Sequence, residues 1–116
     1  MNVFIVGAGP GDPELITVKG QKLLSEADVI IYAGSLVNPA LLDYAKAGCE
    51  IHNSASMTLP QVINVIEDGV KHGKMVVRLH TGDPSIYGAI QEQMDALDKL
   101  GIEYKVVPGV SSFLAT

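Results

Sequence analysis

One stretch, residues 75–88 with the sequence MVVRLHTGDPSIYG, constrains the fold more than any other part of the chain. Its beginning is almost entirely apolar, which is typical of a parallel strand that is covered on both faces. Gly82 and Asp83 then end the strand, and Asp83 followed by Pro84 is a typical start of a helix. A loop between a parallel strand and a helix is where open α/β sheets bind ligands. The loop alone also fits an ordinary turn without a ligand.

The same order of elements recurs along the chain. Helical patterns alternate with runs of strand character at residues 3–6, 29–32, 50–52, 75–79 and 104–107. This alternation predicts an α/β domain with an open, parallel, five-stranded sheet that has helices on both faces. The run at 50–52 is the most polar and is expected at an edge of the sheet.

Local signals mark several helix ends. Thr58 and Gln61 form a potential capping box, and the helix after them is expected to end at Gly73. A short helix is predicted after Asn38, ending at Gly48. The helical stripes that should face the sheet contain Ile16, Gly20, Leu23, Leu24 and Ala27 in the first helix, Val62, Ile63, Ile66 and Val70 in the second, and Tyr87, Ile90, Met94 and Leu97 in the last.

Composition excludes several classes of function. The chain has 116 residues and a net charge of -5, and its eight basic residues are scattered, which argues against a nucleic-acid partner. No apolar stretch approaches the roughly 20 residues that span a bilayer, so no membrane partner is expected. Cys49 is the single cysteine, which fits a reducing cytoplasm and is interpreted as a small buried residue. The three histidines are not at the spacing of metal ligands, so no protein metal site is expected.

The first glycine-rich loop does not match the dinucleotide-binding fingerprint. Gly7 and Gly9 fit, but Asp12 stands where the third glycine belongs, and Tyr32 stands where an acid would bind a ribose hydroxyl. The carboxylate of Asp12 would also occupy the place of a phosphate. A nicotinamide-dependent oxidoreductase is therefore disfavoured, and a cationic ligand without phosphate, such as S-adenosylmethionine, fits better. A non-catalytic α/β domain is the third hypothesis, beside the S-adenosylmethionine-dependent enzyme and the oxidoreductase.

Four ordered motifs resemble the tetrapyrrole methylases, which are S-adenosylmethionine-dependent methyltransferases of the cobalamin and sirohaem pathways. The motifs are GAGPGDPELITVKG at 7–20, LVNPALL at 36–42, VVRLHTGDPSIYG at 76–88 and VVPGVSS at 106–112. Within the family, YAGSLVNPALL at 32–42 and NSASMTL at 53–59 are most similar to the members that methylate precorrin-4 or cobalt-precorrin-4 at C-11. Members that methylate uroporphyrinogen-III or another precorrin are the alternative.

The resemblance implies a two-domain enzyme, a homodimer when complete, with the methyl donor held between its domains. Residues 1–116 would be the N-terminal α/β domain, and a C-terminal domain would be absent from this chain. The positions that match the donor contacts of the family are Pro10, Thr81, Gly82, Asp83, Ile86, Ser111 and Ser112. Asp12 would face the macrocycle and is the candidate for proton handling, although a simple helix cap is the alternative role.

Arg78 is the one charge inside a predicted core strand. Because an unpaired buried charge is costly, Arg78 needs a carboxylate partner or a place at the rim of the cleft. A substrate carboxylate and a structural partner are both open. Tyr32, Met57 and Tyr87 are candidates for contact with an adenine or a tetrapyrrole face, and packing in the core is the alternative for each.

Overall fold

The computed structural model describes residues 2–8, 18–32, 39–81 and 87–107. For residues 8, 18, 39–41, 81 and 87–89 it describes the backbone alone. The elements in chain order are β1 Val3–Ala8, α1 Val18–Glu26, β2 Val29–Tyr32, the 3-10 helix η3 Pro39–Tyr44, β3 Glu50–Asn53, the 3-10 turn η4 Ser54–Ser56, α2 Leu59–Lys71, β4 Val76–Thr81, α3 Tyr87–Lys99 and β5 Lys105–Val107.

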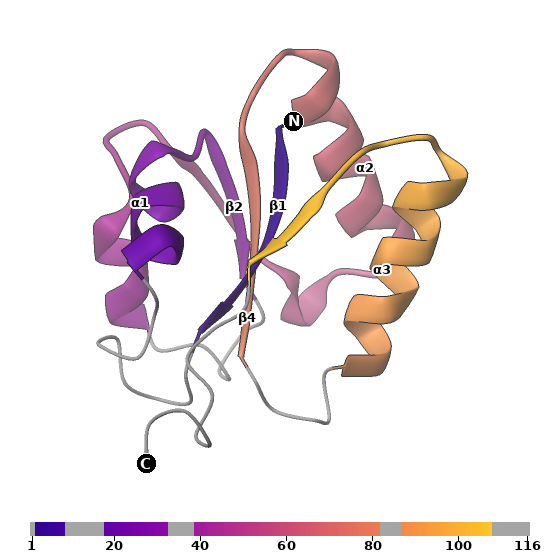
Figure 1. Cartoon of the computed structure of the whole chain (residues 1–116), viewed down its shortest axis with the longest axis horizontal. Helices are drawn as coiled ribbons and strands as arrows, with labels where there is room; N and C mark the ends of the chain where they lie inside the picture. Colours follow the sequence, from indigo (N-terminus) through magenta and orange to yellow (C-terminus); the bar gives the residue numbers. More distant parts are fainter. Residues whose placement is uncertain (1, 9–17, 33–38, 82–86, 108–116) are drawn as a thin grey trace.

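The five strands form one parallel sheet in the order β3-β2-β4-β1-β5. Helix α1 covers one face of the sheet, and α2 and α3 cover the other (Figure 1). The predicted fold class, an open five-stranded parallel sheet with helices on both faces, is therefore confirmed. β3 lies at one edge, as its polarity predicts, and the short β5 lies at the other.

The core has two layers because side chains alternate along each strand. Val77 and Leu79 of β4 pack toward Leu23 and Leu24 of α1, whereas Val76 packs on the opposite face. That opposite layer is completed by buried side chains of the two other helices, namely Val62, Ile63, Ile66 and Leu97. β4 is the central strand and contributes to both layers, which explains why its sequence is apolar almost without interruption.

The predicted helix ends of α2 are confirmed. The Thr58 backbone N–H donates to Gln61 Oε1 over 2.8 Å, and the Gln61 N–H donates to Thr58 Oγ1 over 3.4 Å, which completes the capping box. Just beyond the other end of the helix, Gly73 has a φ of +70°, a conformation that glycine adopts without strain.

One of the predicted helices differs in detail from the structure. The short helix after Asn38 is a 3-10 helix over Pro39–Tyr44, and Gly48 follows it with a φ of +83°. Six residues are too few to make a stable α-helix without strong packing, and a 3-10 turn is the usual form of such short pieces. In α1, which is described over Val18–Glu26, Gly20 of the predicted stripe is buried, and Ile16 lies outside the described residues. In the part of the chain that the structure describes, no helix is long and apolar enough to cross a membrane.

Candidate functional site at the carboxyl edge of the sheet

β1 and β4 are neighbours and end at the same level of the sheet. Their last pairs in register are Gly7 with His80 and Ala8 with Thr81. Residues 9–17 follow β1 and residues 82–86 follow β4, so the two Gly-Asp-Pro sequences leave the sheet from adjacent strand ends. The structure thus brings together the starting points of the two glycine-rich loops.

The two strands continue to opposite faces of the sheet. β1 leads to α1 on one face, and β4 leads to α3 on the other (Figure 1). Such a reversal opens a crevice at the carboxyl ends of the strands, and open α/β sheets bind their ligands there. β5 pairs with β1 on the other side, with Val107 opposite Val6, so residues 108–112 begin beside the same edge.

The predicted site residues follow three adjacent strands, β4, β1 and β5. Thr81 is the last residue of β4, and its backbone is paired with that of Ala8. The other predicted positions lie outside the described residues: Pro10, Asp12, Gly82, Asp83, Ile86, Ser111 and Ser112. Their roles remain predictions.

For two of the three candidates for ring contact, the structure supports packing in the core. Tyr32 packs against the core layer on the α1 side, and its carbonyl accepts a hydrogen bond of 2.9 Å from Ser54 Oγ. Met57 packs against the layer formed by α2 and α3. The side chain of Tyr87 lies outside the description.

Arg78 is almost completely buried, with 3% of its surface exposed. Its Nε donates to Oε1 of Gln93 over 2.8 Å, and its Nη1 donates to the carbonyl oxygens of Ile31 and Leu79, each over 3.3 Å. The expected carboxylate is not among the recorded partners in the described part of the chain, and the polar groups found there are neutral. Neutral hydrogen-bond acceptors therefore lie at Nε and Nη1, where a carboxylate was one of the two expected environments.

Burial lowers the pKa of Arg78 to about 10. The side chain therefore stays positively charged at neutral pH, deep in the sheet and two residues before His80 at the site edge. Gln93, its partner, is 5% exposed. Sequence reasoning missed Gln93, although a signal exists: it occupies a core-facing position of the stripe that contains Ile90, Met94 and Leu97.

The other titratable candidates point away from catalysis. Burial raises the pKa of the Cys49 thiol, which disfavours the reactive thiolate, and the residue is partly buried, less than expected. His52 Nε2 lies 2.8 Å from Glu50 Oε2 on the edge strand, and His72 is exposed at the end of α2. Among the described residues, no three His, Cys, Asp or Glu side chains are grouped to hold a metal ion.

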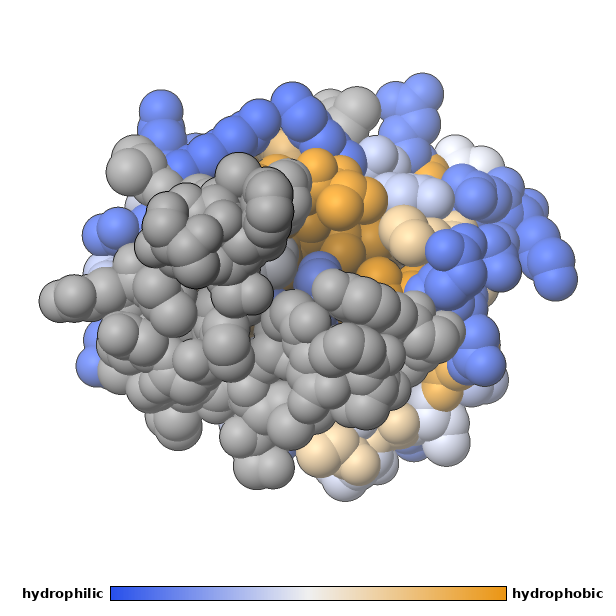
Figure 2. Space-filling view, turned by 60° about the horizontal axis from the view of Figure 1, so that its bottom comes forward, coloured by the Kyte–Doolittle hydropathy of each residue, from blue (hydrophilic) through white to orange (hydrophobic). Residues whose placement is uncertain are grey.

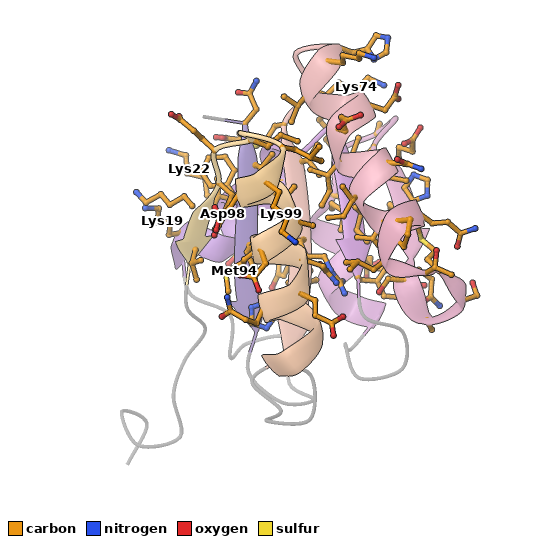
Figure 3. The ribbon with its side chains drawn as sticks, turned by 90° about the vertical axis from the view of Figure 1, so that its right-hand side faces the viewer. Lys19, Lys22, Lys74, Met94, Asp98 and Lys99 are labelled. Carbon is orange, nitrogen blue, oxygen red and sulfur yellow. The ribbon has the colours of Figure 1, made fainter. Side chains whose placement is uncertain are left out.

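Three of the basic residues lie close together on the surface beside β5. Figure 3 shows Lys19 and Lys22 projecting together from α1 near β5. Lys105 of β5 lies close to Lys19, and a side-chain hydrogen bond between them, together with the repulsion of like charges, lowers the pKa of Lys19. This acidic chain therefore carries a basic area beside β5.

Comparison with known proteins agrees with the geometry. A sequence profile of the tetrapyrrole (corrin/porphyrin) methylases matches residues 2–116. The chain is 66% identical over 113 residues to the cobalt-precorrin-4 C(11)-methyltransferase of Methanocaldococcus jannaschii, covering 97% of this chain and 44% of that protein. The chain thus spans about half the length of the curated relatives it matches.

Solved structures show the same likeness. The crystal structure of a cobalt-precorrin-4 methyltransferase is 52% identical, with a TM-score of 0.88 over 97% of this chain and 47% of its own. Uroporphyrin-III C-methyltransferase from Thermus thermophilus, in complex with S-adenosylhomocysteine, is 37% identical, with a TM-score of 0.76 over 99% of this chain and 47% of its own. The profile match over nearly the whole sequence and these likenesses lead to one conclusion: the chain belongs to the tetrapyrrole methylase family.

Proposed function

We propose that this chain is the donor-binding part of an S-adenosylmethionine-dependent enzyme that methylates precorrin-4 or cobalt-precorrin-4 at C-11 in corrin biosynthesis. The observation that carries the proposal is the 66% identity to a cobalt-precorrin-4 C(11)-methyltransferase. Residues 1–116 would form the N-terminal α/β domain, and a second domain would close the cleft. The complete enzyme would be a cytoplasmic homodimer.

The described edge of the sheet fits the methyl donor in its overall chemistry. The ligand would lie where β1 and β4 part, next to Gly7 and Ala8, at the position that open α/β sheets use. The loops that follow combine glycines with acids and have no phosphate-binding pattern, which suits a sulfonium. Donor contacts are assigned to Pro10, Thr81, Gly82, Asp83, Ile86, Ser111 and Ser112. That a related structure holds S-adenosylhomocysteine supports S-adenosylmethionine as the ligand, and the residue assignments rest on the match to the motifs of the family.

The donor supplies a methyl group on a positively charged sulfur, and an electron-rich ring carbon supplies the electron pair. The S–CH3 bond breaks as the new C–CH3 bond forms, and the sulfur becomes neutral. The task of the protein residues is to align donor and ring carbon and to exclude water. Asp83 and nearby carbonyls would favour the sulfonium electrostatically. Asp12 would accept or relay a proton on the macrocycle side.

A second candidate is another tetrapyrrole C-methyltransferase. The likeness to uroporphyrin-III C-methyltransferase from Thermus thermophilus favours it, although the identity is lower, at 37%. A substrate with several carboxylates would be repelled by the net charge of -5. The basic area of Lys19, Lys22 and Lys105 would offset that repulsion locally.

Calorimetric titration with S-adenosylhomocysteine, with NADH as the comparison ligand, tests the proposal. Binding of S-adenosylhomocysteine alone is expected. Asp83→Ala should weaken it, whereas Asp68→Ala, at an exposed position of α2, should leave it unchanged. Binding of NADH alone, or no binding to a chain shown to be folded, contradicts the assignment of the donor site to this chain.

A turnover assay tests Asp12 separately. With the tetrapyrrole substrate and the complete enzyme, Asp12→Ala should lower turnover but retain donor affinity. Unchanged turnover removes Asp12 from the mechanism and leaves it as a helix cap.

A further inference from the structure

The buried Arg78 joins three elements just below the proposed donor site. Through Gln93 it is bonded to the second turn of α3, and through the Ile31 carbonyl it is bonded to β2. Its own strand, β4, contributes the Leu79 carbonyl. Residues 82–86 connect β4 to α3, so the Arg78–Gln93 pair links the two elements between which that donor segment is held.

The pair is costly to bury, so its presence asks for an explanation. Arg78 and Gln93 are 3% and 5% exposed, and the hydrogen bonds recorded for the guanidinium are to neutral acceptors. Replacing buried ionic groups with apolar side chains of similar size is often neutral or stabilising. Stability alone therefore does not account for an arginine at this position.

Directional bonding does account for it. A guanidinium is planar and donates in fixed directions, so bonds from one side chain to β2, β4 and α3 fix their relative positions more closely than apolar contacts do. Around the pair, Ile5 of β1 packs against Ile90 of α3, and Met94, labelled on α3 in Figure 3, packs against the same two residues. The packing fills the space, and the hydrogen bonds set the register.

We infer that Arg78 and Gln93 are positioning residues for the methyl donor, which hold β4 and α3 at the separation that residues 82–86 need to bind it. The inference rests on the proposed function. Because donor contacts demand sub-ångström placement, loosening this link should reduce donor affinity even where the fold is retained.

The deciding variant is the double substitution Arg78→Met with Gln93→Leu. It removes the recorded side-chain hydrogen bonds of the pair, leaves neither partner unpaired, and fills the same space with apolar groups. We expect a melting temperature close to that of the parent chain and a Kd for S-adenosylhomocysteine that is at least about tenfold weaker. Gln91→Leu makes the same kind of change at an exposed position of α3 and should leave the Kd unchanged.

Two further arms keep the inference testable. Gln93→Glu retains an acceptor oxygen for Arg78 Nε and should bind S-adenosylhomocysteine as tightly as the parent, whereas Gln93→Leu alone should bind it more weakly. If the double variant does not fold, the comparison of these two single variants tests the inference. Amide hydrogen exchange of the chain without ligand should become faster at residues 79–90 in the double variant or in Gln93→Leu, but not in Gln91→Leu.

The outcomes separate the inference from the proposed function. A folded double variant with the affinity of the parent overturns the inference, as does equal affinity of the Gln93→Leu and Gln93→Glu variants. If the parent chain binds no S-adenosylhomocysteine, the proposed function fails for this chain, and the exchange measurement still decides. Unchanged exchange at residues 79–90 then overturns the positioning role.

Discussion

Gly69 allows α2 to approach the central strand β4 closely. Replacing Gly69 with alanine tests whether the helix and the strand can move apart to accept a side chain. Gly69 is buried in the last turns of α2, where an alanine would normally be preferred by about 1 kcal/mol. Its backbone is helical, so an alanine meets no conformational penalty there. A Cβ at this position would lie 2.6 Å from Cγ2 of Val76, about 0.8 Å inside the closest ordinary contact of 3.4 Å.

Val76 has little freedom to move away. It is fully buried, it pairs with Val3 on one side and Val29 on the other, and its branched side chain has a stiff χ1 angle. Overpacking of this kind costs about 1–3 kcal/mol. After the gain in helix propensity, Gly69→Ala should destabilise the protein by up to about 2 kcal/mol.

A double-mutant cycle tests the stated cause. Val76→Ala removes the colliding methyl group and should by itself cost about 1.5–3 kcal/mol. In that background Gly69→Ala should be neutral or stabilising by up to about 1 kcal/mol, which gives a coupling energy of about 2 kcal/mol. Urea unfolding followed by circular dichroism measures each free energy, with constant m values as the check on two-state behaviour.

Asn64→Ala is the matched control, because Asn64 is an exposed residue of the same helix. It should stabilise the protein by a few tenths of a kcal/mol through helix propensity alone. If Gly69→Ala is stabilising in the parent as well as in the Val76→Ala background, the contact does not limit the approach of α2, and the reasoning is refuted.

Three other predictions concern stability and association. Thr58→Ala should cost about 1 kcal/mol in urea unfolding because it removes the side-chain half of the capping box. The pKa of Asp28 is lowered, mainly by its hydrogen bond with Lys46. The ionised carboxylate therefore stabilises the fold above the ordinary pKa of 3.8, and this stabilisation is lost as the pH falls through the lower pKa of the folded state. The difference in melting temperature between the parent and Asp28→Asn should shrink over that acid range. Apolar side chains are exposed on the described surface (Figure 2). One of these large apolar side chains is Val106 of the edge strand β5, which is 48% exposed. Val106→Lys should therefore reduce concentration-dependent light scattering, and equal scattering by parent and variant would exclude this edge as a cause of self-association.

Local sequence patterns predicted most of the fold because the forces involved are local or periodic. The apolar runs place the strands, and the Thr58–Gln61 pair places the start of α2 through a hydrogen bond between near neighbours. The 3-10 form of η3 could not be read in the same way, since a six-residue segment takes its conformation from its surroundings. Gly69 carries no sequence signal for the close approach to Val76, because that contact depends on how the helix packs on the sheet.

For the candidate site, too, the sequence predicts features that depend on local patterns but not those that depend on contacts between distant residues. Alternation of strands and helices predicts that residues 9–17 and 82–86 both begin at the carboxyl edge of a parallel sheet. The pairing of β1 with β4 in the structure adds that the two strands are neighbours. The sequence also shows that Arg78 needs a partner, since a charge in a buried strand must be satisfied. It does not show which partner, because Gln93 is 15 residues away and hydrogen-bond acceptors of several kinds would serve.

The neutral partners of Arg78 bear on what the arginine contributes. A buried carboxylate would form an ion pair that neutralises the guanidinium, and such a pair would be explained by its charges alone. Gln93 and two backbone carbonyls leave the charge in place, yet they fix the direction of each bond. A side chain that is expensive to bury, is not neutralised by these partners, and is bonded to the elements on either side of one short segment contributes geometry more than stability. That segment, residues 82–86, belongs to the stretch 75–88 that most constrains the fold, and three of the assigned donor contacts, Gly82, Asp83 and Ile86, lie in it.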